Sequence, residues 1–249
     1  MKNKFDCLIF DMDGVLIDVS RSYRKAIENT VNYYLAKNGS SNKISQKEVN
    51  YLKNQPGFNN DWDTSYRLVT LVNKETLTEI FPVTDEERNT NIFQKIKVLF
   101  QIFYLGSELY KSVYEKKALL AGVSGLIERE SLLISKQLLN RLKQKYSLAI
   151  ATGRPRLEAL FTLKRFNLLP IFLAETLVAM EDAARAKPFP DPMIEAAKKA
   201  GGNSNVYIGD SPNDMEAAEK AGMFSIYVGQ DILGDLQIND VNQLEEIFL

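Results

Sequence analysis

Short apolar runs recur along the chain, and each ends abruptly at a polar residue or a glycine. Runs of this kind occupy residues 5–10, 146–153, 205–211 and 224–229. Their length and sharp ends are typical of buried β-strands. Between them, apolar residues recur at intervals of three and four, as in residues 134–142 and 157–164, which is the spacing along one face of an α-helix. Strands that alternate with helices predict a parallel sheet with helices on both faces.

Two of the predicted helices have recognisable ends. Asp191 is expected as the N-cap of one helix, and Gly201 is expected to end it. The next helix is expected to begin at Ser211 and to end at Gly222. These signals place each helix between two of the predicted strands, as the alternating pattern requires.

The middle of the chain has a different pattern. Residues 19–119 show no alternation of strand, turn and helix, and their apolar positions indicate amphipathic helices separated by short polar breaks. An insertion of roughly a hundred residues after the first strand is too long for an ordinary connection. We therefore predict an α/β core domain formed by residues 1–18 and 120–249, and an inserted all-helical cap domain formed by residues 19–119.

The composition narrows the kinds of binding partner and the cellular compartment that are expected. The 249 residues are 45% hydrophobic and 25% charged, with a formal net charge of -1, which gives no support for a nucleic-acid or membrane partner. No uncharged apolar run approaches the roughly 18 residues of a membrane-spanning helix, and the N-terminal residues lack the features of a signal peptide. The single cysteine, Cys7, cannot form an intrachain disulfide. A cytoplasmic protein, monomeric or homodimeric, is expected.

The chain contains no histidine, and this narrows the possible chemistry. A Ser-His-Asp triad, a zinc site with histidine ligands and an imidazole base are all excluded. If the protein is an enzyme, carboxylates are the main candidates for acid–base work, with lysine, tyrosine and cysteine in reserve.

The candidate chemistry stands at the ends of the predicted strands, where an open parallel sheet binds its ligands. The polar residues at or near these ends are Asp11, Asp13, Thr152, Lys187, Asp210 and Asp214. Carboxylate oxygens suit Mg²⁺, while threonine and lysine can bind phosphoryl oxygens. The sequence therefore predicts a site for Mg²⁺ and a phosphate group.

Each of these residues also has a structural alternative. Asp11 and Asp13 could flank a turn before Gly14, and Thr152 could belong to a turn with the glycine that follows it. Lys187 could be a solvated lysine. Asp214 lies three residues after Ser211, which is the spacing of a capping box with Asp in place of Glu. Their common order and placement favour a shared site over these alternatives.

Four motifs carry a family resemblance. In chain order, "DMDGVLID", "ATGRP", "AKPFPDP" and "GDSPNDMEAAEKAG" resemble the four motifs of the haloacid dehalogenase-like hydrolase superfamily. The insertion after the first motif resembles the helical cap of the phosphoglycolate phosphatase and β-phosphoglucomutase branch. The resemblance implies a Rossmann-like core and phosphoryl transfer with Mg²⁺ as cofactor.

The resemblance also implies a role for each motif residue. Asp11 would be the nucleophile that forms an aspartyl-phosphate, and Asp13 would be the general acid and then the base. Thr152 would hold the phosphoryl group and Lys187 would neutralise charge. The implied metal ligands are Asp11, the carbonyl of Asp13, Asp210 and Asp214. A dehalogenase has no need of the second acid, because a halide leaves without a proton, so Asp13 favours a phosphatase.

Further residues are candidates for substrate binding. Gly153 and Arg154 follow Thr152, and Arg154 could bind a second anionic group or be a solvated arginine. In the cap, Asn59, Asn60 and Trp62 could contact the part of the substrate that is not phosphate. The alternative for Trp62 is that it packs within the cap while a neighbouring acid caps the next helix.

The prediction is a phosphatase that acts on a small phosphorylated metabolite. A phosphosugar mutase of the β-phosphoglucomutase kind would use the same two aspartates but return the phosphoryl group to the sugar. A receiver-type signalling or binding module would also combine acids, threonine and lysine around Mg²⁺, but it would not need Asp13 because it has no leaving group to protonate.

Overall fold

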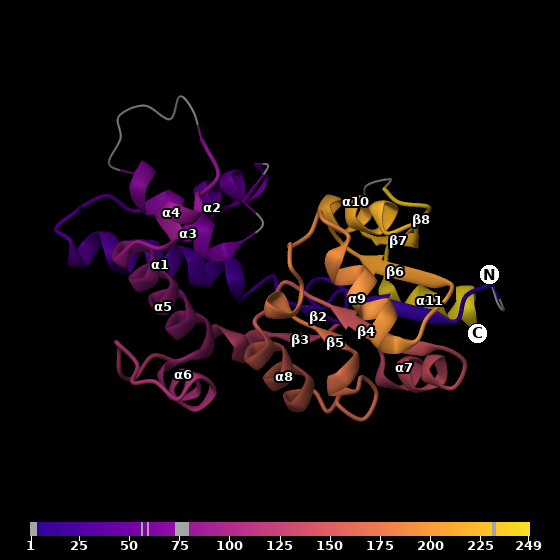
Figure 1. Cartoon of the computed structure of the whole chain (residues 1–249). Helices are drawn as coiled ribbons and strands as arrows, with labels where there is room; N and C mark the ends of the chain where they lie inside the picture. Colours follow the sequence, from indigo (N-terminus) through magenta and orange to yellow (C-terminus); the bar gives the residue numbers. More distant parts are fainter. Residues whose placement is uncertain (1–3, 56, 59, 73–79, 231–232) are drawn as a thin grey trace. The chain divides into compact units, whose positions relative to one another are not determined.

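Six parallel strands form the sheet of the core in the computed structural model (Figure 1). The structure describes residues 4–55, 57–58, 60–72, 80–230 and 233–249. The strand order is β5-β4-β1-β6-β7-β8. The strands are β1 (Cys7–Phe10), β4 (Ser147–Ala151), β5 (Leu177–Val178), β6 (Asn205–Gly209), β7 (Phe224–Val228) and β8 (Leu236–Ile238). The four apolar runs of the sequence are β1, β4, β6 and β7, so the predicted parallel sheet is confirmed, with two further short strands at its edges.

Strand β1 lies inside the sheet and is fully buried. Ile9 pairs with Ala149 of β4 on one side and with Tyr207 of β6 on the other. Because both faces of this strand are covered, every position can be apolar, which explains the uninterrupted hydrophobic run. The strand that delivers Asp11 is therefore held from both sides.

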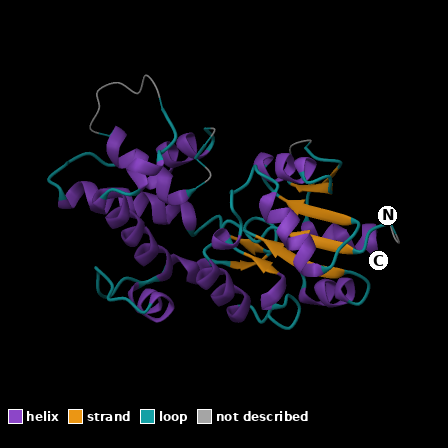
Figure 2. Cartoon of the chain, viewed as in Figure 1, coloured by secondary structure: helices purple, strands orange, loops and turns teal. Residues whose placement is uncertain are grey.

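Helices cover both faces of this sheet (Figure 2). Helices α9 (Asp191–Ala200) and α10 (Pro212–Lys220) pack on the face that carries Cys7 and Ile9. On the opposite face, Phe10 meets Phe172 edge-on with ring centroids 5.6 Å apart. The remaining helical segments of the core are α7 (Lys136–Lys143), α8 (Arg156–Arg165), α11 (Leu244–Phe248) and the short 3₁₀ turns η2 (Ala174–Thr176), η3 (Met180–Asp182) and η4 (Val241–Gln243).

The predicted helix ends are only partly correct. Ser211 caps α10 as expected, and Gly201 follows α9 in the left-handed conformation with a φ angle of 69°. Asp191, however, is the first residue of α9 and not its N-cap, a position taken by Pro190. The carboxylate of Asp191 is instead held by the guanidinium of Arg185, so it has a partner outside the backbone.

The helical unit comprises residues 19–130. Its helices are α1 (Tyr23–Lys37), α2 (Gln46–Lys53), α3 (Asp61–Leu71), α4 (Asp85–Arg88), α5 (Asn91–Leu105), α6 (Ser107–Tyr114) and the 3₁₀ turn η1 (Leu126–Arg129). Gly106, with a φ angle of 84°, separates α5 from α6. Among the described residues, no helix combines the length and the apolar character needed to cross a membrane.

The second boundary between the two units differs from the expected one. The core unit resumes at Ser131, whereas the sequence placed the change after residue 119. Glu130 explains the difference, because its buried carboxylate accepts hydrogen bonds from Ser22 at 2.9 Å and Tyr104 at 3.0 Å, both in the helical unit. In the core unit, the short antiparallel strands β2 (Ile17–Asp18) and β3 (Ser131–Leu132) join the two chain segments that flank the insertion.

Candidate active site

The predicted site residues follow the ends of neighbouring strands. Asp11 comes directly after β1, Thr152 after β4 and Asp210 after β6. The amide of Asp11 donates to the carbonyl of Ile208 at 2.8 Å, so the ladder between β1 and β6 continues past the last residue of β1. The sheet therefore holds these side chains at one edge, where the carboxyl ends of parallel strands meet.

Three carboxylates lie close enough together to share a cation. Asp11, Asp210 and Asp214 each offer an oxygen, and these oxygens lie within 4.8 Å of one another. A cluster of hard oxygen donors is the kind of ligand set that Mg²⁺ binds. Gly14 leaves space for the Asp210 carboxylate, because a Cβ atom at position 14 would lie 1.8 Å from Oδ2 of Asp210. The φ angle of Gly14, +75°, also favours glycine. The donors and this space fit a bound Mg²⁺.

Lys187 lies between two of these carboxylates. Its ammonium group is 2.9 Å from Oδ1 of Asp11 and 2.7 Å from Oδ1 of Asp214. Burial alone would lower the pKa of Lys187, but the attraction of Asp11 and Asp214 outweighs burial and raises it. Lys187 is therefore a buried, charged group of the site, which excludes the solvated lysine.

The pKa values of the carboxyl groups show how strongly negative charge is concentrated here. Burial raises the pKa of Asp11 to about 7, against the opposing attraction of Lys187. Burial also raises the pKa of Asp210 to about 8, and the charges of Asp11 and Asp214 add to the rise. For Asp214, burial acts in the same direction, but the charge of Lys187 and the hydrogen bonds it accepts hold its pKa below the ordinary value. A divalent cation among these carboxylates would relieve their repulsion.

Asp214 forms the capping box that the sequence offered as its structural alternative, and its carboxylate also faces the candidate site. Its Oδ2 accepts a hydrogen bond from the Ser211 amide at 3.1 Å, and the Ser211 hydroxyl accepts one from the Asp214 amide at 3.2 Å, which together form a capping box. Its Oδ1 faces Lys187. The cap of α10 therefore fixes the carboxylate and leaves one oxygen for the site.

Tyr207 is a site residue that the sequence reasoning missed. Its hydroxyl accepts a hydrogen bond from Lys187 at 2.7 Å and lies 3.0 Å from Oδ1 of Asp214, to which it can donate. Burial, followed by the charges of Asp214 and Asp11, raises its pKa well above the ordinary value, so the phenol stays protonated. The sequence feature that could have identified Tyr207 is its hydroxyl group, which lies in the middle of an otherwise apolar predicted strand.

Thr152 is buried at the end of β4, and its hydroxyl oxygen accepts a hydrogen bond from the amide of Arg154 at 3.1 Å. This leaves the hydroxyl hydrogen of Thr152 to be donated elsewhere. Gly153 between them is exposed, and a side chain at this position would meet open space.

The side chain of Asp13 lies outside the carboxylate trio and is bound by Arg154. The Nε and Nη2 atoms of Arg154 lie 2.7 Å and 2.5 Å from Oδ1 of Asp13. Nη1 of Arg154 donates to the hydroxyl of Thr162 at 2.7 Å. Only 1% of the Arg154 side chain is exposed, so the structure excludes the solvated arginine that the sequence left open.

The cap candidates lie at the start of α3. The side chain of Asn60 accepts hydrogen bonds from the amides of Trp62 at 2.8 Å and Asp63 at 3.2 Å, so Asn60 is the N-cap that was expected of an acid. Lys97 places its ammonium group 3.8 Å from the centre of the Trp62 ring. Asn59 lies outside the described residues. Selection of the substrate by Asn60 and Trp62 stays a prediction.

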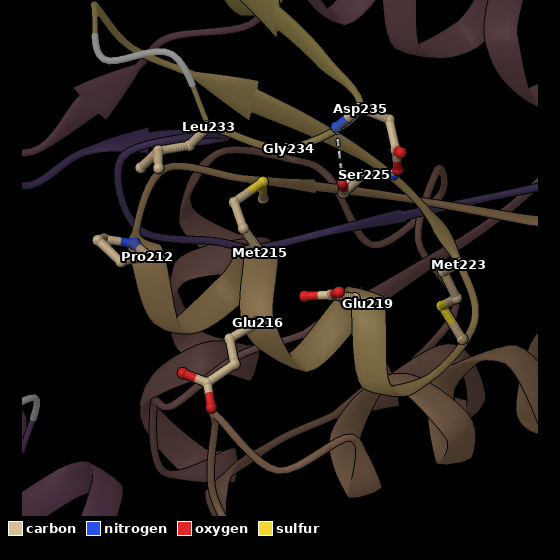
Figure 3. Close-up of a pocket in the computed structure, with 9 residues that line it drawn as sticks. All are labelled: Pro212, Met215, Glu216, Glu219, Met223, Ser225, Leu233, Gly234 and Asp235. Carbon is tan, nitrogen blue, oxygen red and sulfur yellow. Dashed lines mark hydrogen bonds between the residues drawn. The ribbon is translucent and has the colours of Figure 1, made fainter.

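A separate pocket of 530 Å³ lies beside α10, between this helix and the segment that leads into β8 (Figure 3). Its walls include Pro212, Met215 and Leu233, and they contain none of the catalytic candidates. Asp235 in its wall accepts hydrogen bonds from the amide and the hydroxyl of Ser225. Asp235 thus serves to hold the start of β7.

Comparisons with known sequences agree with the motif reading. A family model described as haloacid dehalogenase-like hydrolase matches residues 5–222. The chain is 28% identical over 226 residues to an imidazoleglycerol-phosphate dehydratase from Phytophthora nicotianae, a match that covers 89% of this chain but 43% of that protein. It is 27% identical over 233 residues to a putative pyrophosphatase PpaX from Caldanaerobacter subterraneus, covering 92% of this chain and 84% of that protein. The chain thus spans less than half the length of the Phytophthora protein.

Solved structures share the fold over nearly the whole chain. The phosphatase Tt82 from Thermococcus thioreducens is 29% identical, with a TM-score of 0.71 and coverage of 96% of this chain and 97% of that one. A putative phosphoglycolate phosphatase from Lactobacillus plantarum has a TM-score of 0.64 at 16% identity, with full coverage of both chains (100%). A putative β-phosphoglucomutase from Thermotoga maritima has a TM-score of 0.63 at 20% identity and covers 97% of each chain. The resemblance carried by the four motifs is confirmed.

Proposed function

Because the chain belongs to the haloacid dehalogenase-like hydrolases, we propose that it is a Mg²⁺-dependent phosphatase that acts on a small phosphomonoester. The reaction passes through an aspartyl-phosphate on Asp11. The observation that carries this proposal is the contact of Lys187 with Asp11 at 2.9 Å, beside the oxygens of Asp210 and Asp214. A carboxylate can attack a phosphate only where positive charge offsets the repulsion between two anions.

Asp11 is held in a way that suits a nucleophile. Its Oδ1 accepts hydrogen bonds from the amide of Met12 at 2.8 Å and from Lys187. Among the described residues no hydrogen bond ends at Oδ2, which is therefore the oxygen available to attack phosphorus. Mg²⁺, held by Asp11, Asp210 and Asp214, would supply further positive charge to the phosphoryl group. Forming the phosphate ester on Asp11 divides hydrolysis into two displacements.

Asp13 and Thr152 complete the set of residues proposed to act in the reaction. Asp13 would donate a proton to the leaving oxygen and then accept one from the water that hydrolyses the aspartyl-phosphate. The hydroxyl of Thr152 accepts from the Arg154 amide, so its hydrogen can be donated to a phosphoryl oxygen. The backbone of Gly153 and the cap residues Asn60 and Trp62 are proposed to contact the substrate.

The test is a screen for phosphate release from phosphorylated metabolites, with and without Mg²⁺. The panel includes inorganic pyrophosphate, because one relative is named a putative pyrophosphatase. Asp11→Asn is expected to abolish release, and EDTA is expected to suppress release by the wild type until Mg²⁺ is restored. Glu246→Gln, a change at an exposed carboxylate, is the matched control and is expected to keep full activity. Undiminished turnover by Asp11→Asn would overturn the mechanism.

Product analysis separates the competing functions. A phosphatase releases free phosphate, whereas a phosphosugar mutase yields an isomerised sugar phosphate. A receiver-type module would give a stable phosphorylated Asp11 without turnover. Mass spectrometry of acid-quenched protein is expected to detect a phosphoryl group on the peptide that contains Asp11 in the wild type and none in Asp11→Asn.

A further inference from the structure

Arg154 has an unusual position for an arginine. It is among the largest fully buried side chains of the described residues, and it follows the threonine of the second motif by two positions. A buried guanidinium is costly unless its N–H groups are bound, and Arg154 directs two of its nitrogens at Asp13 and a third at Thr162. The burial of Arg154 is thus tied directly to the second aspartate of the first motif.

The backbone of Arg154 is anchored as well. Its amide donates to the hydroxyl of Thr152 at 3.1 Å, and its carbonyl accepts from the amide of Met180 at 2.9 Å. Thr162, which receives the far end of the guanidinium, is fully buried in α8. Arg154 is consequently held at both ends and can act as a rigid support for Asp13.

The contact distinguishes the two oxygens of Asp13. Both bonds from Arg154 end at Oδ1, and among the described residues no hydrogen bond ends at Oδ2. An arginine only donates, so Oδ1 must accept and a proton carried by Asp13 must sit on Oδ2. The Asp13 side chain is 30% exposed, compared with 1% for Arg154, so the arginine binds the aspartate from its protein side.

We propose that Arg154 is a positioning residue that fixes Oδ1 of Asp13 and presents Oδ2 for proton transfer to the leaving oxygen of the substrate. This inference rests on the proposed function, because it assigns Asp13 as the general acid. It replaces the earlier expectation that Arg154 binds an anion of the substrate, since its Nε, Nη1 and Nη2 atoms are already engaged within the protein.

The test uses esters that differ in their need for a proton. Dinitrophenyl phosphate releases a stable anion and needs none, whereas phenyl phosphate and alkyl phosphates need one. Single-turnover measurements with enzyme in excess follow transfer to Asp11 and exclude the later hydrolysis step. Arg154→Met is expected to slow transfer from phenyl phosphate by about 100-fold and from dinitrophenyl phosphate by less than about threefold. Arg154→Lys, which keeps one donor, is expected to lie between Arg154→Met and the wild type.

Four further variants make the result specific. Asp13→Asn should show the same dependence on the leaving group, and Arg154→Lys should add almost nothing to it in the double variant, because Arg154 acts through Asp13. Thr162→Val removes one bond to Arg154 and should give a smaller loss of the same kind, even if the arginine variants fold poorly. Arg156→Lys is the matched control, because Arg156 binds Asp182 and does not touch Asp13.

The possible outcomes separate the inference from the function on which it rests. If the wild type hydrolyses no ester, the proposed phosphatase is wrong. If the wild type is active but the Arg154 and Thr162 variants slow all esters equally, Arg154 has only a structural role. If they accelerate transfer, Arg154 holds Asp13 away from the substrate. Either of these last two results overturns the positioning role and leaves the phosphatase intact.

Discussion

Replacing Asp210 by asparagine should abolish the metal site and, at the same time, make the metal-free protein more stable at neutral pH. The carboxyl group of Asp210 is largely buried, and burial together with Asp11 and Asp214 raises its pKa from the ordinary value of 3.8 to about 8. Asparagine occupies nearly the same space without a charge. The variant would therefore lose a ligand for Mg²⁺. It would also lose a carboxyl group that ionises more easily in the unfolded chain than in the folded protein, a difference that favours unfolding at neutral pH.

The size of the effect follows from proton binding. Between pH values of about 4 and about 8, Asp210 is protonated in the folded protein but ionised in the unfolded chain. Because the folded state then binds the extra proton, the contribution of Asp210 to the stability of the metal-free wild type falls as pH rises, by about 1.4 kcal/mol for each pH unit. From about pH 5 to pH 7 the loss is roughly 2–3 kcal/mol, or about 5–10 °C in Tm for a protein of this size.

Thermal unfolding in EDTA across this pH range is the assay. The Tm of the wild type should fall with increasing pH, while that of Asp210→Asn should fall by about half as much, because Asp11, whose pKa is raised to about 7, keeps its own contribution. The difference between the two proteins should therefore widen toward neutral pH. Mg²⁺ should raise the Tm of the wild type most at the higher pH values, because it binds the ionised carboxylates, and should have little effect on Asp210→Asn. Glu246→Gln, at an exposed position, should follow the wild type under all conditions.

Two results would refute this reasoning. Parallel pH profiles for the wild type and Asp210→Asn would show that folding does not raise the pKa of Asp210. Equal stabilisation of both proteins by Mg²⁺ would show that the metal binds without this carboxylate.

Two further substitutions test the support of the site. Gly14→Ala should weaken Mg²⁺ binding and lower phosphatase activity by at least about tenfold, because the new Cβ would lie 1.8 Å from the Asp210 carboxylate. Gly222→Ala is the control: Gly222 has a similar positive φ angle but open space around it, so this change should affect stability alone. Tyr207→Phe should lower kcat by about tenfold and stability by about 1–2 kcal/mol, because Lys187 loses a hydrogen-bond acceptor. Phosphate release, Mg²⁺ titration and chemical denaturation measure these effects, and unchanged activity in Gly14→Ala or Tyr207→Phe would contradict the assigned role of that residue.

The helical unit shows where local patterns were ambiguous. The apolar pattern of residues 19–119 predicted amphipathic helices but not the break at Gly106 that separates α5 from α6. The boundary after Glu130 was also misplaced, since no local feature of residues 120–130 reveals that Glu130 is bound by Ser22 and Tyr104. The position of this boundary therefore depends on contacts between segments that are distant along the chain.

The strand ends were easier to predict. The apolar runs before Asp11, Thr152 and Asp210 identified buried strands, because uninterrupted hydrophobic segments of that length have few other places in a folded protein. Parallel strands bring their carboxyl ends to one edge of the sheet, so the sequence alone was enough to assign these three residues to one site.

Individual side-chain partners required the folded protein. Tyr207 reads as one more apolar strand position, yet its hydroxyl lies against Lys187. Arg154 reads as a surface arginine, yet it is buried against Asp13, 141 positions away in the chain. The periodicity of a sequence reports which face of an element is covered, because burial of apolar area follows that period. The choice of a hydrogen-bond partner depends on distances between atoms that only the packed tertiary structure brings together.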